Sequence, residues 1–386
     1  MCKELFFRGK RKQKIMIYAQ EAGGGNILAL TTQDLLLDNK YDIDIVVHRE
    51  GVKPFKEQGI PYKLLESFGY PIPLTVSDAV GLLSLLEPDY LYGAMGNIKL
   101  DISNGSIFQA ARKMNIKSIS VLDCWKGWTR FQGKNDPMKY APDVLLVIDE
   151  YSKKRMIEEG FCEQSVIVAG HPVLSQIEKH FRKPEMECER VNLRNRYGID
   201  ENDFLLVFTS QMLNHYVESH SKREDYYSIK TEKGKVVERI LNVLQDISKE
   251  MRDTNFVLLL RLHPKEMWQD TLEYNNSEVR VIVDKDISRF DLYYMADCFV
   301  GFDTMILAEA SYARCSVILF RLHEIKCSEE INFVERASDD IKIAQNEAEL
   351  YSLLKRIIYH KDEKIEPNKS FSDNCCYPYI LYRCFS

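Results

Sequence analysis

The sequence predicts an α/β protein made of two doubly wound domains, each built around a parallel sheet. Short apolar segments typical of buried parallel strands alternate with helix-forming segments along most of the chain. The length of 386 residues exceeds what one hydrophobic core usually spans, which favours two domains. Polar residues directly follow several strands, at the sheet edge where α/β folds bind ligands.

The first half of the chain alternates strands and helices from Lys14 onward. Residues 15–19 are expected to form a strand, 20–26 a glycine-rich turn and 27–38 a helix. Further strands are expected at 41–48, 62–65, 89–92, 117–122, 144–148 and 166–168. Helices are expected at 51–58, 77–86, 102–114 and 150–159.

The second half restarts after a polar stretch at 174–203, where we expect a linker and a surface helix. We place an N-terminal domain at 1–178 and a C-terminal domain at 179–386. Strands are expected at 204–208, 256–260, 279–283, 297–300 and 316–319, and a long helix at 234–251. The aromatic tail from Cys375 is expected to pack back on the first domain, with a membrane interface as the alternative.

Composition excludes several classes of partner and site. The net charge of −6 gives no overall attraction to nucleic acid. Ten cysteines without a C-x-x-C pair favour reduced thiols over a zinc site or a disulfide framework. No apolar run is long enough to cross a bilayer and no signal peptide is in view, so we expect a cytoplasmic protein. The basic residues within 1–14 leave open a peripheral contact with the inner face of the membrane.

Two segments of the second half predict a phosphate site. The strand at 256–260 leads into Arg261 and His263, and the strand at 297–300 leads through Asp303 to a helix that begins near Thr304. The Thr304 hydroxyl and the amides of Thr304 and Met305 suit an anion at a helix N-terminus, whereas the Asp303 carboxylate would repel it. Two residues that follow the strand at 204–208 are further candidates: Ser210 and Gln211.

Three short pieces of the sequence form a recognisable set: Gly170-His-Pro-Val173, Arg261-Leu-His-Pro264, and Gly301-Phe-Asp-Thr304 with the helix and strand that follow it. They resemble the GT-B glycosyltransferases and their relatives, the hydrolysing nucleotide-sugar 2-epimerases, the lipid-A-disaccharide synthases and the CDP-glycerol glycerophosphotransferases. The chain departs from the family pattern at Asp303-Thr304 and at Arg314-Cys-Ser316.

The resemblance implies two Rossmann-like domains that face a central cleft, with the nucleotide on the C-terminal one. It implies a UDP-, CMP- or CDP-linked sugar as substrate, without a cofactor or a metal. His263 would contact the leaving phosphate, or else only cap its strand. Glu309 would hold the ribose, or else be an ordinary acid on a helix face.

The acceptor is expected on the N-terminal domain. Gly24, Gly25 and Asn26 allow a ligand to approach the backbone closely. Asp123 and Glu21 are rival general bases at strand ends. Two further candidates for sugar or acceptor binding are Trp125, which otherwise belongs to the core, and His171, which otherwise stiffens the junction.

We therefore expect a glycosyltransferase that moves a sugar from a nucleotide sugar to a glycan, a lipid-linked acceptor or a surface polysaccharide. A nucleotide-sugar 2-epimerase or hydrolase would use the same nucleotide pocket without an acceptor. The same motifs are also compatible with a CDP-glycerol type polyol-phosphate transferase and with a non-catalytic nucleotide-binding relative.

Overall fold

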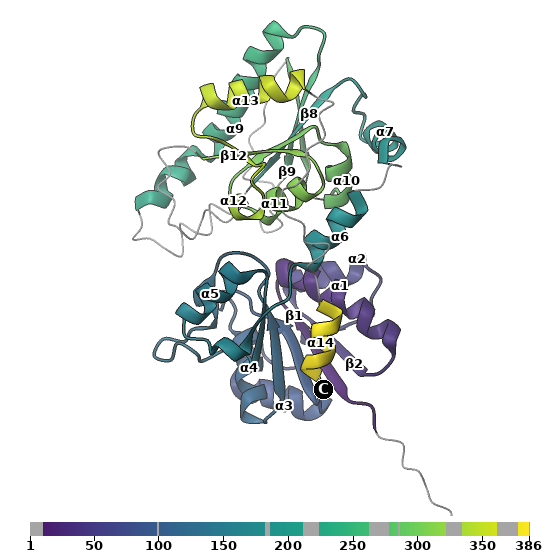
Figure 1. Cartoon of the computed structure of the whole chain (residues 1–386), viewed down its shortest axis with the longest axis vertical. Helices are drawn as coiled ribbons and strands as arrows, with labels where there is room; N and C mark the ends of the chain where they lie inside the picture. Colours follow the sequence, from purple (N-terminus) through teal and green to yellow (C-terminus); the bar gives the residue numbers. More distant parts are fainter. Residues whose placement is uncertain are drawn as a thin grey trace, which may run out of the picture. The chain divides into compact units, whose positions relative to one another are not determined.

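The computed structural model describes residues 11–98, 100–181, 186–210, 224–261, 278–284, 286–321, 334–360 and 377–385. The chain forms two compact units. Unit 1 comprises Met1–Ser175 and Asp373–Ser386, and unit 2 comprises Gln176–Ser372. Each unit contains its own sheet with helices packed beside it (Figure 1).

The sheet of unit 1 has seven parallel strands in the order β3-β2-β1-β4-β5-β6-β7. The strands are β1 (Lys14–Ala19), β2 (Asp42–Val47), β3 (Lys63–Leu64), β4 (Tyr90–Ala94), β5 (Lys117–Val121), β6 (Val144–Val147) and β7 (Val166–Val168). Because β1 pairs with β2 on one side and with β4 on the other, the order of the strands reverses at β1. The carboxyl ends of β1 and β4 are therefore the ligand-binding edge that the topology predicts.

The helices that connect these strands are α1 (Ala22–Asp38), α2 (Val52–Glu57), α3 (Val76–Leu86), α4 (Ser103–Lys113) and α5 (Glu150–Glu158). Short 3-10 helices are η1 (Arg49–Gly51), η2 (Leu65–Phe68), η3 (Trp128–Phe131) and η4 (Glu163–Ser165). Among the described helices, none combines the length and the apolar character needed to cross a membrane.

The glycine-rich segment after β1 is helical, so the prediction of a turn there was wrong. Helix α1 starts at Ala22 and includes the three consecutive glycines. A Cβ atom on Gly24 would lie 2.2 Å from the Cβ of Ala94, and one on Gly25 would lie 3.2 Å from Cγ of Pro54. The glycines thus let the first turn of α1 lie directly against β4 and α2, at a cost in intrinsic helix propensity.

The sheet of unit 2 has six parallel strands in the order β10-β9-β8-β11-β12-β13. The strands are β8 (Phe204–Thr209), β9 (Phe256–Arg261), β10 (Val279–Asp284), β11 (Cys298–Gly301), β12 (Ser316–Phe320) and β13 (Lys342–Ala344). The five strands expected in this half are confirmed, whereas β13 was not foreseen. Strands β8 and β9 are buried along their whole length, which explains their continuous apolar sequences.

The helices of unit 2 are α7 (Met186–Arg196), α9 (Glu224–Glu250), α10 (Arg289–Met295), α11 (Met305–Tyr312), α12 (Val334–Ala337) and α13 (Glu347–Tyr359). Helix α6 (Pro172–Phe181) carries the chain from unit 1 to unit 2, and the change of unit falls between Ser175 and Gln176. Among its described residues, the polar stretch after Leu174 is largely helical, so it contains more helix than the linker and single surface helix that we expected.

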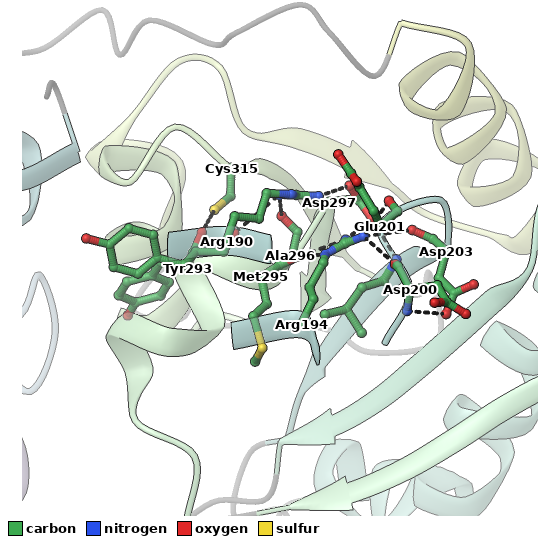
Figure 2. A network of polar contacts seen from close by, with 12 residues as sticks. Arg190, Arg194, Asp200, Glu201, Asp203, Tyr293, Met295, Ala296, Asp297 and Cys315 are labelled. Atoms are coloured by element: carbon green, nitrogen blue, oxygen red, sulfur yellow. Dashed lines mark hydrogen bonds and ion pairs between the residues drawn. The ribbon is translucent and has the colours of Figure 1, made fainter. Parts of the chain in front are cut away.

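The polar sequence of α7 conceals a buried arginine. The Arg194 side chain is 1% exposed. It donates to an oxygen of the Asp297 carboxylate at 2.6 Å and to the carbonyl of Met295 (Figure 2). It also donates to three carbonyls in the loop that leads into β8: those of Asp200, Glu201 and Asp203. Arg194 thus fixes α7 to the segments that lead into β8 and β11.

The chain returns to unit 1 in its last described helix, α14 (Tyr377–Phe385). The carbonyl of Phe385 accepts a hydrogen bond from the Tyr90 hydroxyl at 2.5 Å. The Phe385 ring lies edge-on to the rings of Tyr41, Tyr90 and Tyr92, with centroids 5.4, 5.2 and 6.3 Å away. Helix α14 is accordingly part of the aromatic core of unit 1.

Candidate functional site

Hydroxyl groups gather at the edge of unit 2 where the order of its strands reverses. Strand β8 pairs with β9 on one side and with β11 on the other, so the carboxyl ends of β8 and β11 define this edge. Oγ1 of Thr209 lies 3.4 Å from Oγ1 of Thr304. A Cβ on Gly301 would come within 2.2 Å of the Thr209 hydroxyl, so only glycine leaves room for this pairing of strands.

The predicted helix start after β11 is present. Thr304 is the N-cap of α11, and Met305 is its first residue. The Thr304 side chain makes no capping hydrogen bond, so its hydroxyl is not used to close the helix. A helix N-terminus with a neighbouring hydroxyl favours an anion, because backbone N–H groups and the helix dipole point at it.

The Asp303 side chain binds the backbone of a different segment, at the start of α12. Its side chain is buried, and Oδ1 accepts a hydrogen bond from the backbone N–H of Val334 at 3.2 Å, at the start of α12. The Asp303 carboxylate is therefore hydrogen-bonded to the α12 segment.

Arg261 ends β9 beside the same edge. Its Nη1 atom donates to Oδ2 of Asp284 at 2.9 Å, and both side chains are mostly buried. Its carbonyl accepts from the N–H of Ser210, so Ser210 lies next to it. The structure thus brings Arg261, Ser210, Thr209 and Thr304 to one edge, while His263 and Gln211 lie outside the described residues.

Glu309 is buried among partners from α10. Both carboxylate oxygens lie 3.2 Å from Nη1 of Arg289, and Oε2 accepts from the Tyr293 hydroxyl at 2.6 Å. Burial raises the pKa of Tyr293 well above its usual range, and the Glu309 charge raises it further, so Tyr293 stays protonated as a donor. Neither the ribose interpretation of Glu309 nor that of a solvated acid anticipated these partners.

In unit 1, Asp123 is paired with an arginine that no sequence pattern had singled out. Oδ1 of Asp123 lies 2.7 Å from Nη1 of Arg130, and both side chains are largely buried. Burial raises the pKa of Asp123, but the Arg130 charge and hydrogen bond outweigh it and hold that pKa below its usual value. Arg130 also donates to the carbonyls of Met95, Lys126 and Gly127.

Glu21, the rival base, lies in the same group of residues. It precedes α1 as the N-cap residue, and Oε1 accepts from the backbone N–H of Asn97 at 3.0 Å. Its charge contributes to the raised pKa of Arg130, after the larger effects of Asp123. The two acids are thus brought together around Arg130, at the ends of β1 and β5. A Cβ on the exposed Gly23 would lie 2.2 Å from Oδ2 of Asp123.

Trp125 and His171 are buried beside Asp123 and contact each other. Trp125 is 2% exposed, donates to Oδ2 of Asp149 at 2.8 Å and stacks on the His171 ring. Of the two alternatives given above for Trp125, sugar binding and a place in the core, this burial favours the core. Nδ1 of His171 accepts from the N–H of Leu174, so its Nε2 carries the hydrogen and donates to the carbonyl of Asp123 at 3.3 Å.

A second polar network at the edge of unit 1 was not predicted. Nε2 of His48 lies 3.0 Å from Oδ2 of Asp101, and Nδ1 lies 2.5 Å from Oε1 of Glu66. Arg49 adds a contact to Asp101 at 3.6 Å. His48 directly follows β2, so the rule that picks out residues at strand ends would have found it, whereas nothing in the sequence pairs it with Asp101 or Glu66.

The remaining predicted residues, Gly24, Gly25 and Asn26, lie in the first turns of α1. Gly24 and Gly25 are buried by β4 and α2, and Asn26 is partly exposed. Within the described ranges, no group of three or more His, Cys, Asp and Glu side chains is arranged to hold a metal ion.

No protein-family model and no curated protein sequence matches this chain at a significant level. Solved structures do match it along nearly its whole length. The UDP-GlcNAc 2-epimerase of Methanocaldococcus jannaschii, solved with UDP-GlcNAc and UDP, is 16% identical with a TM-score of 0.64, covering 97% of this chain and 99% of that one. The Neisseria meningitidis enzyme bound to UDP-GlcNAc is 14% identical, with a TM-score of 0.66 and the same coverage.

Anabaena HepE in complex with UDP and glucose is 12% identical with a TM-score of 0.56, again covering 97% of this chain and 99% of that one. The fold is therefore GT-B-like, as predicted. At these identities the likeness establishes the architecture alone, and the chemistry has to be argued from the residues of this chain.

Proposed function

We propose that the protein is a glycosyltransferase that uses a nucleotide sugar. The observation that carries this proposal is the edge of unit 2 between β8 and β11, where Thr209 and Thr304 lie together at the start of α11. The carboxylate nearest to that helix start, Asp303, serves α12 instead. Such an edge suits the diphosphate of a nucleotide.

The proposed role of unit 2 is to stabilise the departing nucleotide. As the bond between the sugar C1 and the phosphate oxygen breaks, negative charge grows on the diphosphate. The Thr304 hydroxyl and the first amides of α11 donate to those oxygens, and the helix dipole favours the charge. Arg261 adds a positive charge beside this edge, although Asp284 already uses one face of its guanidinium.

In unit 1 we assign the general base to Glu21 in preference to Asp123. Asp123 is held by Arg130 and its lowered pKa makes it a weak base, so it positions the loop after β5. Glu21 is only partly buried, and the exposed Gly23 beside it leaves the backbone open to an incoming acceptor. Glu21 takes the proton of the acceptor hydroxyl while the acceptor oxygen forms the bond to C1 and the nucleotide leaves.

A nucleotide-sugar 2-epimerase or hydrolase is the second candidate. It is favoured by the whole-chain likeness to the UDP-GlcNAc 2-epimerases of M. jannaschii and N. meningitidis. It requires the same nucleotide-binding edge but no acceptor.

Calorimetric titration with UDP, CDP and CMP tests the shared part of both candidates. We expect one nucleoside diphosphate to bind in the micromolar range, and absence of binding by all three would exclude both. Incubation with a panel of the corresponding nucleotide sugars then separates them. Nucleotide released only when a glycan or lipid-linked acceptor is present supports transfer. Release or isomerisation without acceptor supports the second candidate, and binding without turnover indicates a non-catalytic relative.

A further inference from the structure

Helix α14 presents an unusual outer face. Its inner residues Tyr377, Leu381, Cys384 and Phe385 are buried in unit 1. The outer residues are Tyr379, Ile380, Tyr382 and Arg383, and Tyr379 is 65% exposed. Arg383 is the single charged residue of the helix. An outward face of tyrosine, isoleucine and arginine without an acid is typical of helices that lie in a membrane interface.

The end of α1 extends this face. The Lys40 ammonium lies 4.9 Å from the centre of the Tyr382 ring, and the Tyr382 hydroxyl bonds to the Asp38 carboxylate. Leu37, the residue before Asp38, is 85% exposed. We call the set of Leu37, Lys40, Tyr379, Tyr382 and Arg383 the α1–α14 surface. An exposed leucine among tyrosines and cations combines apolar contact with positive charge.

Charges at this surface favour an anionic partner. The Asp38 carboxylate is compensated by Lys40 at 2.7 Å, and the Arg383 guanidinium lies 5.8 Å from the centre of the Tyr379 ring. Lys12 adds a further cation, since its ammonium binds the carbonyl of Asn39 at the end of α1 at 2.7 Å. Burial raises the pKa of Tyr382, and the Asp38 carboxylate and then Asp34, on the same helix, raise it further.

The sequence that precedes β1 is basic. Gln13 donates to the Tyr90 hydroxyl, which in turn donates to Phe385, so the start of β1 lies beside the end of α14. The first fourteen residues of the sequence contain six basic residues against one acidic residue, together with Leu5-Phe6-Phe7. The start of β1 thus follows a basic stretch of sequence and lies beside the end of α14.

We infer that the α1–α14 surface docks on an anionic membrane. Tyr379, Tyr382 and Leu37 enter the headgroup region, and Arg383 and Lys12 bind lipid phosphates. This inference concerns a face formed by α1 and α14 and does not depend on the proposed reaction. A protein of net charge −6 would bind such a membrane only through a local surface of this kind.

Vesicle sedimentation of the full chain tests the inference. We expect binding to phosphatidylcholine vesicles that contain phosphatidylglycerol, no binding to phosphatidylcholine alone, and weaker binding as salt rises above about 0.15 M. The double substitution Leu37→Ser and Tyr379→Ser is expected to weaken binding by a factor of about ten or more, because it removes the apolar contact. Arg383→Gln is expected to weaken it about fivefold.

A matched control is available in the same chain. Leu85 and Tyr359 are 63% and 66% exposed, and the double substitution Leu85→Ser and Tyr359→Ser should leave vesicle binding unchanged. Equal loss in both double variants, or no binding of the wild type to anionic vesicles, would overturn the inference. So would a wild-type dimer in light scattering that only the Leu37 and Tyr379 variant dissociates, because the surface would then bind a second copy. Circular dichroism verifies the fold, and Arg383→Gln provides the test if the double variant does not fold.

Discussion

Arg130 donates to Asp123 across 2.7 Å, and the two side chains are largely shielded from water. One of the two acids predicted as a general base is therefore committed to an ion pair. Because Arg130 also binds three backbone carbonyls, the pair organises the loop after β5 and the end of β4. In the proposed reaction this arrangement favours Asp123 as a positioning residue and Glu21 as the base.

Replacement of Arg130 by methionine should destabilise the protein by about 3 kcal/mol at pH 7, because it leaves a buried carboxylate without its partner. The pKa of Asp123 is lowered in the folded state, so the stabilisation by the pair is complete above the unfolded value of about 3.9 and is lost as pH falls through the folded value. Urea unfolding from pH 3 to 8 should show the two proteins converging below about pH 4.

The control for this substitution is Arg155→Met. Arg155 pairs with Glu158 and Glu159 in contacts that are more exposed, and its loss should cost less than about 1 kcal/mol. A pH-independent effect of Arg130→Met would show that packing, and not the ion pair, is responsible.

Replacement of Glu21 by glutamine should lower the rate of sugar transfer by at least about 10²-fold, because the amide cannot accept a proton from the acceptor. Affinity for the nucleotide should be unchanged, since Glu21 belongs to unit 1. Turnover assays and calorimetry on the same preparation measure the two quantities. A rate within roughly threefold of wild type would remove Glu21 from the proposed mechanism.

The hydroxyl of Thr304 should matter for binding and not for stability. Thr304→Val is expected to weaken nucleotide binding about tenfold, through the loss of one hydrogen bond to a charged oxygen, and Thr304→Ser should restore it. Unfolding free energy should change by less than about 0.5 kcal/mol, because this side chain makes no capping bond to α11.

Ser288→Ala is the control for the effect on stability. Ser288 is the N-cap of α10 and accepts a hydrogen bond from the Asp291 amide, so its replacement should destabilise the protein by about 1 kcal/mol.

Alanine at Gly24 should destabilise unit 1, although alanine in a helix normally stabilises relative to glycine by about 1 kcal/mol. The added Cβ would lie 2.2 Å from the Cβ of Ala94, so α1 and β4 would have to move apart, at a cost of about 2 kcal/mol or more. Gly25→Ala meets a milder contact at 3.2 Å and should cost less. Thermal unfolding of the two variants compares them directly, and a stabilised Gly24→Ala protein would contradict the close approach.

Arg194→Met should be among the most damaging single changes in unit 2. It removes hydrogen bonds to four carbonyls and an ion pair with Asp297, for an expected loss of about 4 kcal/mol. Arg194→Lys should recover little, because an ammonium cannot reproduce the planar set of donors. Arg196→Met, at an exposed position on the same helix, should stay within about 0.5 kcal/mol of wild type in urea unfolding.

The alternation of strands and helices was predictable because buried parallel strands impose continuous apolar sequences, as in β8 and β9. The start of α1 could not be predicted, because three consecutive glycines indicate a turn unless the residue that packs against them is known. That partner is Ala94, which lies in β4 and far from α1 in the sequence. Strand β13 spans only three residues and gives no periodic signal.

Residues at strand ends were found where the strand itself was evident, as for Asp123, Glu21 and Thr304. Their partners were not found, because Arg130 lies in the short 3-10 helix η3 and Arg194 lies in a helix whose sequence is largely polar. Burial of a charged side chain depends on carbonyls brought from distant segments, which no local pattern reveals. The sequence therefore predicted which residues lie at the sheet edges better than it predicted the ion pairs and hydrogen bonds that fix those residues in place.

Unit 1 is discontinuous in the chain, since α14 follows all of unit 2. During synthesis the rings of Tyr41, Tyr90 and Tyr92 must therefore remain without Phe385 until the whole of unit 2 has left the ribosome. A nascent unit 1 would expose this aromatic strip to chaperones in the meantime, and a fragment ending at Ser175 would carry it permanently. Expression of unit 1 in isolation would accordingly require α14 to be joined back to it by a linker.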